Sequence, residues 1–165
     1  MITVCELASA VLDELTDGLE VGDSKKFDRG LGFMAVHVEC LQQTSHGSLF
    51  SVAHYFEMAG DLVPDPDVLF LRLANGSWTP ISFRSSIAYR VAVHFHEDES
   101  VEVDEREQRD LTRFANVWMK NVSEQQGLPT TRRTRRARRP SSLMGAFLSS
   151  PPSRRLTQRP ALRAW

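Results

Sequence analysis

The sequence predicts an α+β fold, in which an antiparallel sheet of about five strands is flanked by an N-terminal and a C-terminal helix. Two observations lead to this fold class. The apolar residues recur with a helical period near both ends of residues 1–129 and with a period of two between them. Turn-forming residues separate the alternating segments. An order of helix, meander and helix is typical of a sheet that has one face covered by helices.

The first helix is predicted from a capping box. Thr3 and Glu6 have the spacing at which a hydroxyl and a carboxylate satisfy the first backbone amides of a helix. Apolar residues then follow at helical spacing until Gly18. Residues 21–32 contain three glycines and mixed charges, which indicates a loop.

The alternating segments begin at Phe33. Asn75-Gly76 is a strong hairpin signal, whereas Gly60-Asp61 and Pro64-Asp65-Pro66 indicate turns. Pro80 indicates an edge or a bulge in its strand. The predicted strands cover residues 33–40, 49–58, 68–73, 78–83 and 89–96, with a short sixth at 101–103. The predicted apolar faces of the first two consist of Met34, Val36, Val38 and Cys40, and of Phe50, Val52, His54, Phe56 and Met58.

The second helix is predicted between clear start and stop signals. Asp104 offers an N-cap, and Glu107 follows three residues later. Gly127 and Pro129 end the helix. Its apolar stripe consists of Leu111, Phe114, Ala115, Trp118, Met119 and Val122.

Charge divides the chain into two parts. Residues 1–129 contain all 21 acidic residues and 10 basic ones, a net charge of −11. Residues 130–165 contain ten Arg and no Lys, Asp or Glu, a net charge of +10. The second part has too few apolar residues to offset the entropy of ordering it. We therefore expect an acidic α+β domain at 1–129 and a disordered Arg-rich tail at 130–165.

The composition also predicts a compartment. Two cysteines, Cys5 and Cys40, are too few for a disulfide scaffold, and we expect two reduced, buried thiols. No segment approaches the roughly 20 apolar residues of a membrane helix. The N-terminal segment lacks the basic and apolar regions of a signal peptide. We therefore expect a cytoplasmic protein without membrane contact.

Residues 51–70 carry an ordered set of polar and turn residues, namely His54-Tyr55, Glu57, Gly60-Asp61 and Asp65-Pro66, ahead of an apolar strand. This run resembles the His-Tyr-x-Glu-x-x-Gly-Asp... Asp-Pro signature of an uncharacterised family, a domain of unknown function that occurs in bacterial, plasmid and phage genomes. The closing helix resembles that family as well, and the likeness covers about residues 30–128. The chain departs from it at Met58-Ala59, where the family usually has Gln-Asn. The resemblance implies a domain boundary and a mobile-element context, but no activity.

Four residues of this run are candidates for catalysis: His54, Tyr55, Glu57 and Asp61. Successive side chains on a strand alternate between faces, so His54 and Glu57 are predicted on opposite faces. This favours a buried histidine that hydrogen-bonds a backbone carbonyl or a carboxylate. Acid–base catalysis is the alternative.

His94 and His96 are candidates for a metal site, because they share one strand face roughly 7 Å apart. His37 and Glu39 would complete a four-ligand zinc site if their strands were neighbours, but a plain meander keeps them apart. The chain has no His-Glu-x-x-His motif and no Cys-x-x-Cys pair. We therefore expect no metal and no other cofactor.

Asp65, Asp67 and Trp78 are candidates for ligand binding. The aspartates supply hard oxygen atoms within one proline-rich segment, but the spacing is not that of an EF-hand. Turn and capping roles are the favoured interpretation. Trp78 lines either a ligand face of the sheet or its core, and the core is the favoured alternative.

The basic block of the tail is a candidate for nucleic-acid binding, because clustered arginines neutralise phosphates and give salt-sensitive contacts. Two alternatives remain open: the tail folds back on the acidic domain, or it is incidental. The block contains Arg132, Arg133, Arg135, Arg136, Arg138 and Arg139.

Two functional hypotheses follow. The first is a non-enzymatic accessory or binding module of bacterial, mobile-element origin, which binds an unknown protein or small ligand and contacts nucleic acid weakly through its tail. The alternative is a small metal-assisted hydrolase or nuclease that uses the cluster of His54, Tyr55, Glu57 and Asp61. Sequence-specific DNA recognition by the domain is disfavoured, since the domain is acidic and has no predicted helix-turn-helix.

Overall fold

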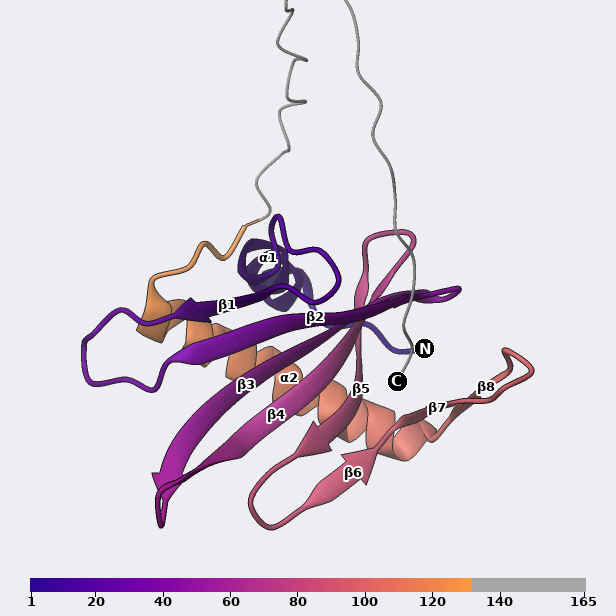
Figure 1. Cartoon of the computed structure of the whole chain (residues 1–165). Coiled ribbons are helices and arrows are strands. Elements are labelled where there is room, and N and C mark those ends of the chain that lie inside the picture. Colours follow the sequence, from indigo (N-terminus) through magenta and orange to yellow (C-terminus); the bar gives the residue numbers. More distant parts are fainter. Residues whose placement is uncertain (132–165) are drawn as a thin grey trace, which may run out of the picture. The chain divides into compact units, whose positions relative to one another are not determined.

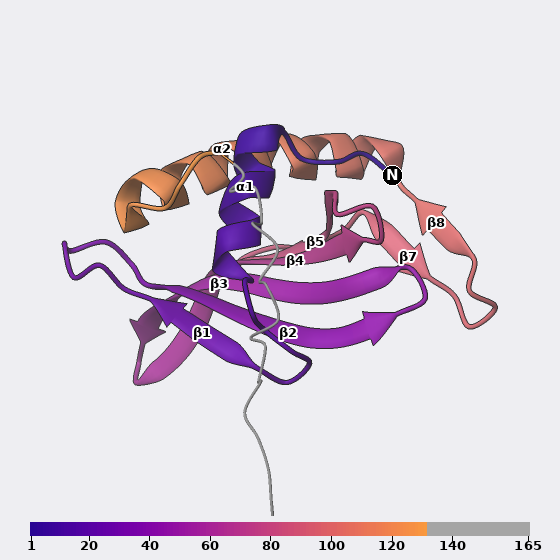
Figure 2. The same cartoon turned by 90° about the horizontal axis from the view of Figure 1, so that it is seen from above.

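Both helices lie on one face of a twisted antiparallel sheet, and neither covers the opposite face (Figures 1 and 2). The computed structural model of the chain describes residues 1–131. Strands β1 to β6 pair in chain order, and β7 and β8 form a separate hairpin. The predicted α+β class with two flanking helices is confirmed, although the main sheet has six strands. The elements are α1 (Glu6–Leu15), β1 (Ser24–Phe27), β2 (Val36–Thr44), β3 (Gly47–Met58), β4 (Asp61–Leu73), β5 (Trp78–Arg84), β6 (Tyr89–Val91), β7 (Val93–Phe95), β8 (Val101–Val103) and α2 (Glu105–Gln126).

Helix α1 begins at Glu6, so the predicted capping box at Thr3 is wrong. Cys5 is the N-cap residue, and no side chain caps the helix. The residues before it pair with the sheet instead: the Val4 N–H donates to the Trp78 carbonyl oxygen at 2.9 Å. This pairing holds the segment extended, and the helix starts only after it.

A short edge strand, β1, occupies residues for which the sequence predicts a loop. It pairs with β2 from Ser24 to Phe27. The first three of its residues are exposed and Phe27 is only partly buried, so no alternating pattern marks the strand. Short strands that carry lysine, as here at Lys25 and Lys26, are common at sheet edges because they discourage pairing with other chains.

The period of two is confirmed for β2 at 36–40 and only in part for β3, where Leu49 and Ala53 are also buried, Phe56 is half-buried and Met58 is exposed. The buried residues of the predicted faces are Val36, Val38 and Cys40 and their register partners His54, Val52 and Phe50. Met34, which is predicted on the same face, precedes the strand and is exposed. Gly47 starts β3 with a φ of +143°, and a Cβ there would lie 2.0 Å from the Arg72 carbonyl oxygen, so only glycine fits. Cys40 is buried as expected, but Cys5 is exposed; both are free.

Strand β4 runs through the segment in which the sequence predicts a proline turn. The register with β3 shifts beside the prolines: Ala53 pairs with Asp67, whereas Tyr55 pairs with Pro64. Pro66 is left out of the ladder by this bulge and needs no donor there, while Pro64 stays in register. Beyond the bulge, residues 55–58 and 61–64 pair only with each other. We call residues 55–64 the β-ribbon; it extends past the rest of the sheet (Figure 1).

The second half of the sheet combines confirmed and wrong predictions. The Asn75-Gly76 turn between β4 and β5 is confirmed, with Gly76 at φ +80°. The bulge near Pro80 is also confirmed, because the register of β4 and β5 shifts between Leu69 and Phe70. The single strand predicted at 89–96 is wrong. Ala92 interrupts it, since its N–H donates to Ile81 and its carbonyl accepts from Asp104, and β7 then pairs with the short strand β8.

Helix α2 has the predicted boundaries. Asp104 accepts hydrogen bonds from the backbone amides of Arg106 and Glu107, and Gly127 ends the helix in the left-handed conformation at φ +66°. Glu107 does not close a capping box, because its carboxylate accepts from Arg90 at 2.7 Å instead. The predicted stripe is buried except for Phe114, which is 37% exposed. Neither helix among residues 1–131 combines the length and apolar character of a membrane span.

A cycle of three hydrogen bonds joins the start of the chain to β5 and α2. The Ile2 N–H donates to Gln108 Oε1 at 2.8 Å, and Gln108 Nε2 donates to Thr79 Oγ1 at 3.1 Å. The Thr79 hydroxyl donates to the Ile2 carbonyl oxygen at 2.7 Å, which closes the cycle. Gln108 is only 1% exposed and Thr79 is fully buried. We refer to this cycle as the Ile2–Thr79–Gln108 network.

Replacing the Thr79 hydroxyl with a methyl group should destabilise the fold. Thr79→Val keeps the shape of the side chain but leaves the Ile2 carbonyl oxygen and the Gln108 amide without their partner, a cost of about 1–3 kcal/mol. Urea unfolding of the full-length protein measures this cost as a lower midpoint at constant slope.

Thr112→Val is the matched control. The Thr112 hydroxyl is buried and has no hydrogen-bond partner among the described residues. Its removal should leave the free energy of unfolding unchanged or raise it by about 1 kcal/mol, because no hydrogen bond is broken. Equal destabilisation by the two substitutions would contradict the energetic role of the Ile2–Thr79–Gln108 network.

Candidate functional site

His54 lies in the core beneath the helices. It is 4% exposed, and its Nδ1 is 2.9 Å from the Ala35 carbonyl oxygen. Its ring also meets the Trp118 ring edge to face, at a centroid distance of 5.5 Å. This arrangement agrees with the interpretation of His54 as a buried histidine. Its Nδ1 is hydrogen-bonded to the backbone of Ala35, directly before β2.

The structure does not gather the four catalytic candidates at one place. Glu57 and Asp61 are exposed on the β-ribbon, where Glu57 pairs with Leu62 and Asp61 pairs with Met58. Tyr55 belongs to the half-buried residues at the base of the β-ribbon. Only Tyr55 therefore lies beside the hollow described below.

The ligand-binding candidates have internal partners. Asp67 Oδ1 accepts from the Ser51 hydroxyl at 2.8 Å, and Asp65 Oδ2 accepts from the Ser86 hydroxyl at 3.1 Å. Trp78 is fully buried, and its Nε1–H donates to Asp13 Oδ1 at 3.0 Å. Trp78 thus belongs to the core, as the favoured interpretation expects.

The metal candidates are on two different sheets. His94 and His96 are exposed at and just after β7, and His96 Nε2 is 3.4 Å from a Glu102 carboxylate oxygen. His37 and Glu39 are on β2, which is not a neighbour of β7. Within the part of the chain that the structure describes, no three His, Cys, Asp or Glu side chains are grouped closely enough to hold a metal ion.

A row of residues that are polar except for the buried Ala53 crosses the whole sheet on the face that the helices leave uncovered. Each member is the register partner of the next, so their side chains share a face. Adjacent residues face the other way: Val36 and Val38 are buried, and Arg90 reaches Glu107 on α2. The row consists of Lys26, His37, Ala53, Asp67, Arg84 and Tyr89, from β1 to β6.

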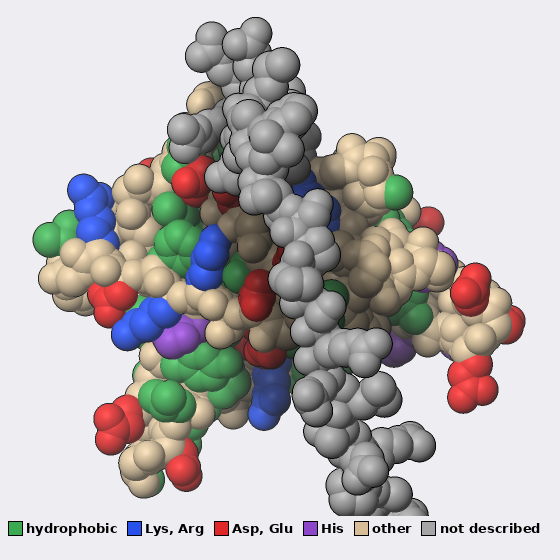
Figure 3. Space-filling model, turned by 45° about the horizontal axis from the view of Figure 1, so that its top comes forward, with side chains coloured by type: hydrophobic (Ala, Val, Ile, Leu, Met, Phe, Trp, Pro, Cys, Tyr) green, Lys and Arg blue, Asp and Glu red, His purple; other side chains and the backbone are tan. Residues whose placement is uncertain are grey.

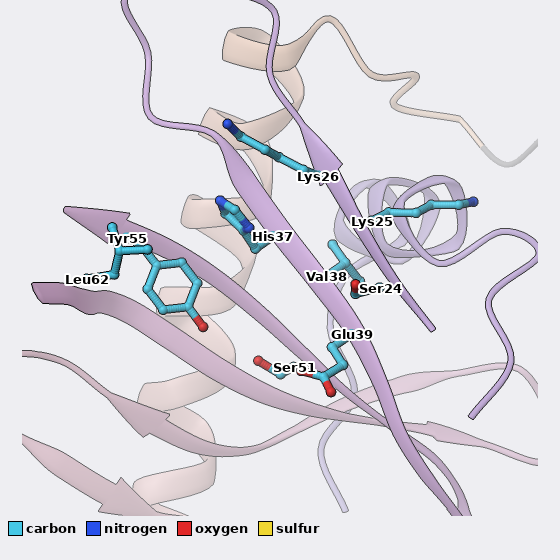
Figure 4. Close-up of a pocket in the computed structure, with 9 residues that line it drawn as sticks. All are labelled: Ser24, Lys25, Lys26, His37, Val38, Glu39, Ser51, Tyr55 and Leu62. Carbon is cyan, nitrogen blue, oxygen red and sulfur yellow. The ribbon is translucent and has the colours of Figure 1, made fainter. Parts of the chain in front are cut away.

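A hollow of about 540 Å³ opens on this face. Figure 4 shows His37 and Tyr55 on neighbouring strands, with the Tyr55 hydroxyl directed toward Ser51 and Glu39. A space-filling view shows a histidine next to a group of hydrophobic side chains, with acidic and basic side chains nearby (Figure 3). The short side chain of Ser51 on β3 lies among larger lining residues. The hollow is lined by Ser24, Lys25, Lys26, His37, Val38, Glu39, Ser51, Tyr55 and Leu62.

Both titratable rings of the hollow are shifted toward their neutral forms. Burial lowers the pKa of His37 from 6.5, and the neighbouring Lys26 and His54 lower it further, while Asp28 opposes them. Burial also raises the pKa of Tyr55 from 10.0, and the carboxylates of Asp67 and Glu39 add to the rise. At neutral pH the hollow therefore presents a neutral imidazole and a phenol, which can donate and accept hydrogen bonds.

The sequence contains three of the nine lining residues as separate candidates but does not group them. His37 and Glu39 come from the predicted metal set and Tyr55 from the predicted catalytic set. Lys26 is missed, because β1 has no alternating pattern. The signal that joins them is the register between β1, β2 and β3, which residue spacing along one strand does not carry.

The chain belongs to a family described as a domain of unknown function (DUF6908), whose model matches residues 7–128. The match begins earlier than the resemblance at about residue 30 indicates, and it includes nearly all of α1 and α2. No curated protein matches the chain. No solved structure matches it either.

NMR titration of the ring protons should give a His37 pKa below its ordinary value of 6.5. The unfolded chain then binds more protons than the folded chain between the folded pKa and the unfolded value. His37 therefore lowers the free energy of unfolding as the pH falls from above 6.5 through this window. The loss of unfolding free energy due to His37 is complete once the pH is below the pKa of His37 in the folded protein.

Lys26→Met separates the causes of this shift. Removal of the ammonium should raise the His37 midpoint, because a neighbouring positive charge no longer opposes protonation. Lys120→Met is the control, since Lys120 is on α2 beside Glu124 and should leave the midpoint unchanged. A His37 midpoint at or above 6.5 in the parent protein would contradict the burial of the ring.

Proposed function

We propose that this member of the DUF6908 family is a non-enzymatic binding module that takes a protein segment or a small ligand on the uncovered face of its sheet. The observation that carries the proposal is the hollow of about 540 Å³ bounded by His37 and Tyr55. Concave sites that combine aromatic side chains with a few polar groups are the usual form of ligand sites. The helices on the opposite face leave this one accessible (Figure 2).

The separation of the catalytic candidates supports binding over hydrolysis. A hydrolytic site needs its nucleophile, base and charge-stabilising groups to converge on one reacting atom. His54 instead holds the Ala35 carbonyl oxygen within the core. Glu57 and Asp61 are exposed on the β-ribbon, so the metal-assisted hydrolase or nuclease alternative retains only Tyr55 in the hollow.

The directions of the two pKa shifts also support binding. General acid–base catalysis is most efficient when the pKa of the group is close to the operating pH. The pKa of His37 is lowered from 6.5, and that of Tyr55 is raised from 10.0. Both pKa values move away from pH 7. The two rings therefore stay uncharged at neutral pH, as suits groups that contact a ligand without exchanging protons with it.

The tail adds a second, weaker activity to this proposal: electrostatic contact with nucleic acid. The six arginines of the block at 132–139 lie outside the described residues, and the support is the charge division of the sequence alone. Six clustered arginines neutralise phosphates without regard to base sequence. The contact should therefore be salt-sensitive and non-specific.

The cellular setting is also part of the proposal. We place the protein in the bacterial cytoplasm as an accessory of a mobile element. The support for bacterial, mobile-element origin is the likeness of residues 51–70 to the signature described above. The support for a reducing compartment is that Cys5 and Cys40, the only two cysteines of the chain, are both free thiols.

An NMR fragment screen on the full-length protein tests the binding role. Soluble cationic, anionic and neutral fragments are added one at a time, and the resonances of His37 and Tyr55 report occupation of the hollow. We expect a subset to give saturable shifts. Ser51→Phe should abolish these shifts, because the new ring fills the hollow that Ser51 lines.

Ser82→Phe is the matched control. Ser51 pairs with Leu69, and Leu69 pairs with Ser82, so the two serines share the same face of the sheet. Ser82 does not line the hollow. It should leave the shifts intact. Two outcomes would contradict the binding-module proposal: no saturable shift at His37 and Tyr55, or phosphodiester turnover that depends on His54 or Glu57.

Six Arg→Gln substitutions test the tail. The full-length variant R132Q/R133Q/R135Q/R136Q/R138Q/R139Q should bind duplex DNA more weakly. The slope of log K against log salt concentration should become shallower by about 0.9 for each phosphate that the variant no longer neutralises. Fluorescence anisotropy with a labelled duplex across a salt series measures both quantities.

The other four arginines of the tail provide the control. The variant R154Q/R155Q/R159Q/R163Q removes charge from the same tail but leaves the block intact. Its slope should change less than that of the block variant. DNA binding that is unaffected by either set of substitutions would contradict a role for the tail in nucleic-acid contact.

A further inference from the structure

We infer that the hollow between His37 and Tyr55 is a cation site for an alkylammonium group, which two aromatic rings and the Glu39 carboxylate receive together. The inference rests on the proposed function, because it names the class of ligand for the same hollow. An alkylammonium group is presented by a lysine side chain of a protein and also by a small amine.

The two rings form adjacent walls. The centroids of the His37 and Tyr55 rings are 5.1 Å apart, and the ring planes are at 87°. Tyr55 is two residues beyond Ala53, the register partner of His37, so the contact is the diagonal one between neighbouring strands. The face of a tyrosine ring attracts an ammonium group electrostatically, and the neutral His37 ring at its side supplies an adjacent wall.

The carboxylate comes from the next position on the same face. Glu39 is two residues after His37, and its register partner on β3 is Ser51. The Tyr55 hydroxyl points toward both Glu39 and Ser51 (Figure 4). Among residues 1–131, Glu39 has no ion pair, and its charge is available to a ligand. After burial, the carboxylates of Asp67 and Glu39 raise the pKa of Tyr55 while Arg84 lowers it, so negative charge lies close to the ring.

The lysines that line the hollow already have partners. Lys26 Nζ is 3.2 Å from an Asp28 carboxylate oxygen, although its charge still lowers the pKa of His37. Lys25 donates to the Asp17 carbonyl oxygen, next to the end of α1. Among residues 1–131 neither ammonium forms an ion pair with Glu39, so the carboxylate is open to a ligand cation.

The remaining walls favour an organic cation over a metal ion. Leu62 of the β-ribbon lines the hollow and is 70% exposed, which provides an apolar surface for an aliphatic stem. A volume of about 540 Å³ exceeds the needs of an ammonium group alone and accommodates the chain that carries it. Metal ions need several oxygen, nitrogen or sulfur ligands, and no group of three such side chains is present among the described residues.

Three probes of equal chain length and different charge test the inference on the full-length protein. n-Butylammonium, 1-butanol and butyrate are titrated separately, and NMR shifts of His37 and Tyr55 give the affinities. We expect saturable shifts with n-butylammonium alone. Nα-acetyl-lysine methylamide is then compared with n-butylammonium: tighter binding by about threefold or more indicates a protein lysine, and equal binding indicates a small amine.

Two pairs of variants identify the contributing groups. Glu39→Gln should weaken n-butylammonium binding by about threefold to tenfold, whereas Glu97→Gln, which removes an exposed carboxylate from the turn after β7, should change it by less than about twofold. Tyr55→Phe keeps the ring face and should bind within about twofold of the parent, whereas Tyr55→Leu should weaken binding by about fivefold or more. The dispersion of the amide spectrum verifies that each variant is folded.

The outcomes separate the ligand class from the proposed function. Equal affinity for 1-butanol or butyrate overturns the cation site but leaves a binding hollow in place. Equal weakening in Glu39→Gln and Glu97→Gln also overturns it, because total charge then explains the binding. No shift with any of the three probes overturns the cation site, and the fragment screen then decides whether the hollow binds other chemistry.

Discussion

The Ile2–Thr79–Gln108 network is the constraint on which the arrangement of the other elements depends. It joins the first residues of the chain to the fifth strand and to the first turn of the last helix, through three hydrogen bonds of 2.7–3.1 Å. Buried polar groups are costly unless every member is paired, so such a network accepts few alternative packings. The Cys5 N–H, which donates to Asn116 Oδ1 at 2.8 Å, continues the connection to the middle of α2. Both helices are thereby held on one side of the sheet.

Because both helices pack on one face of the sheet, the residues that alternate with the core are left on the other face. Along β2 to β4, residues such as Val38, Val52 and Val68 are buried, and the alternate positions form the polar row from Lys26 to Tyr89. Because the side-chain period of a strand is two, a slip of one residue would exchange the core with this row. The same register therefore produces the hydrophobic core and the candidate site. Gly47 helps to fix it, since any Cβ at the start of β3 would collide with the Arg72 carbonyl oxygen.

The sequence predicts the elements that local chemistry specifies and misses those that pairing specifies. The Asp104 cap, the Gly127 stop and the Asn75-Gly76 turn depend on the preferences of one or two residues, and all three are present. Strand β1 and the proline-containing half of β4 exist only because a neighbouring strand supplies their partners, so neither has a pattern of its own. The burial of His54 follows from its position among apolar residues in β3. The contact of His37 with Tyr55 cannot be predicted in this way, because it depends on which strands are adjacent.

Local desolvation, rather than the net charge of −11 for residues 1–129, determines the chemistry of the hollow. Burial is the largest cause of the pKa shift at both His37 and Tyr55, and in each case it favours the uncharged ring. A pair of rings that stays neutral around pH 7 is poorly suited to exchange protons with a substrate. In the same hollow, Glu39 has no ion pair among residues 1–131, and its carboxylate and the face of the Tyr55 ring both suit contact with a cationic group. The physical features that weaken a catalytic role for the hollow are thus the ones that suit it to binding.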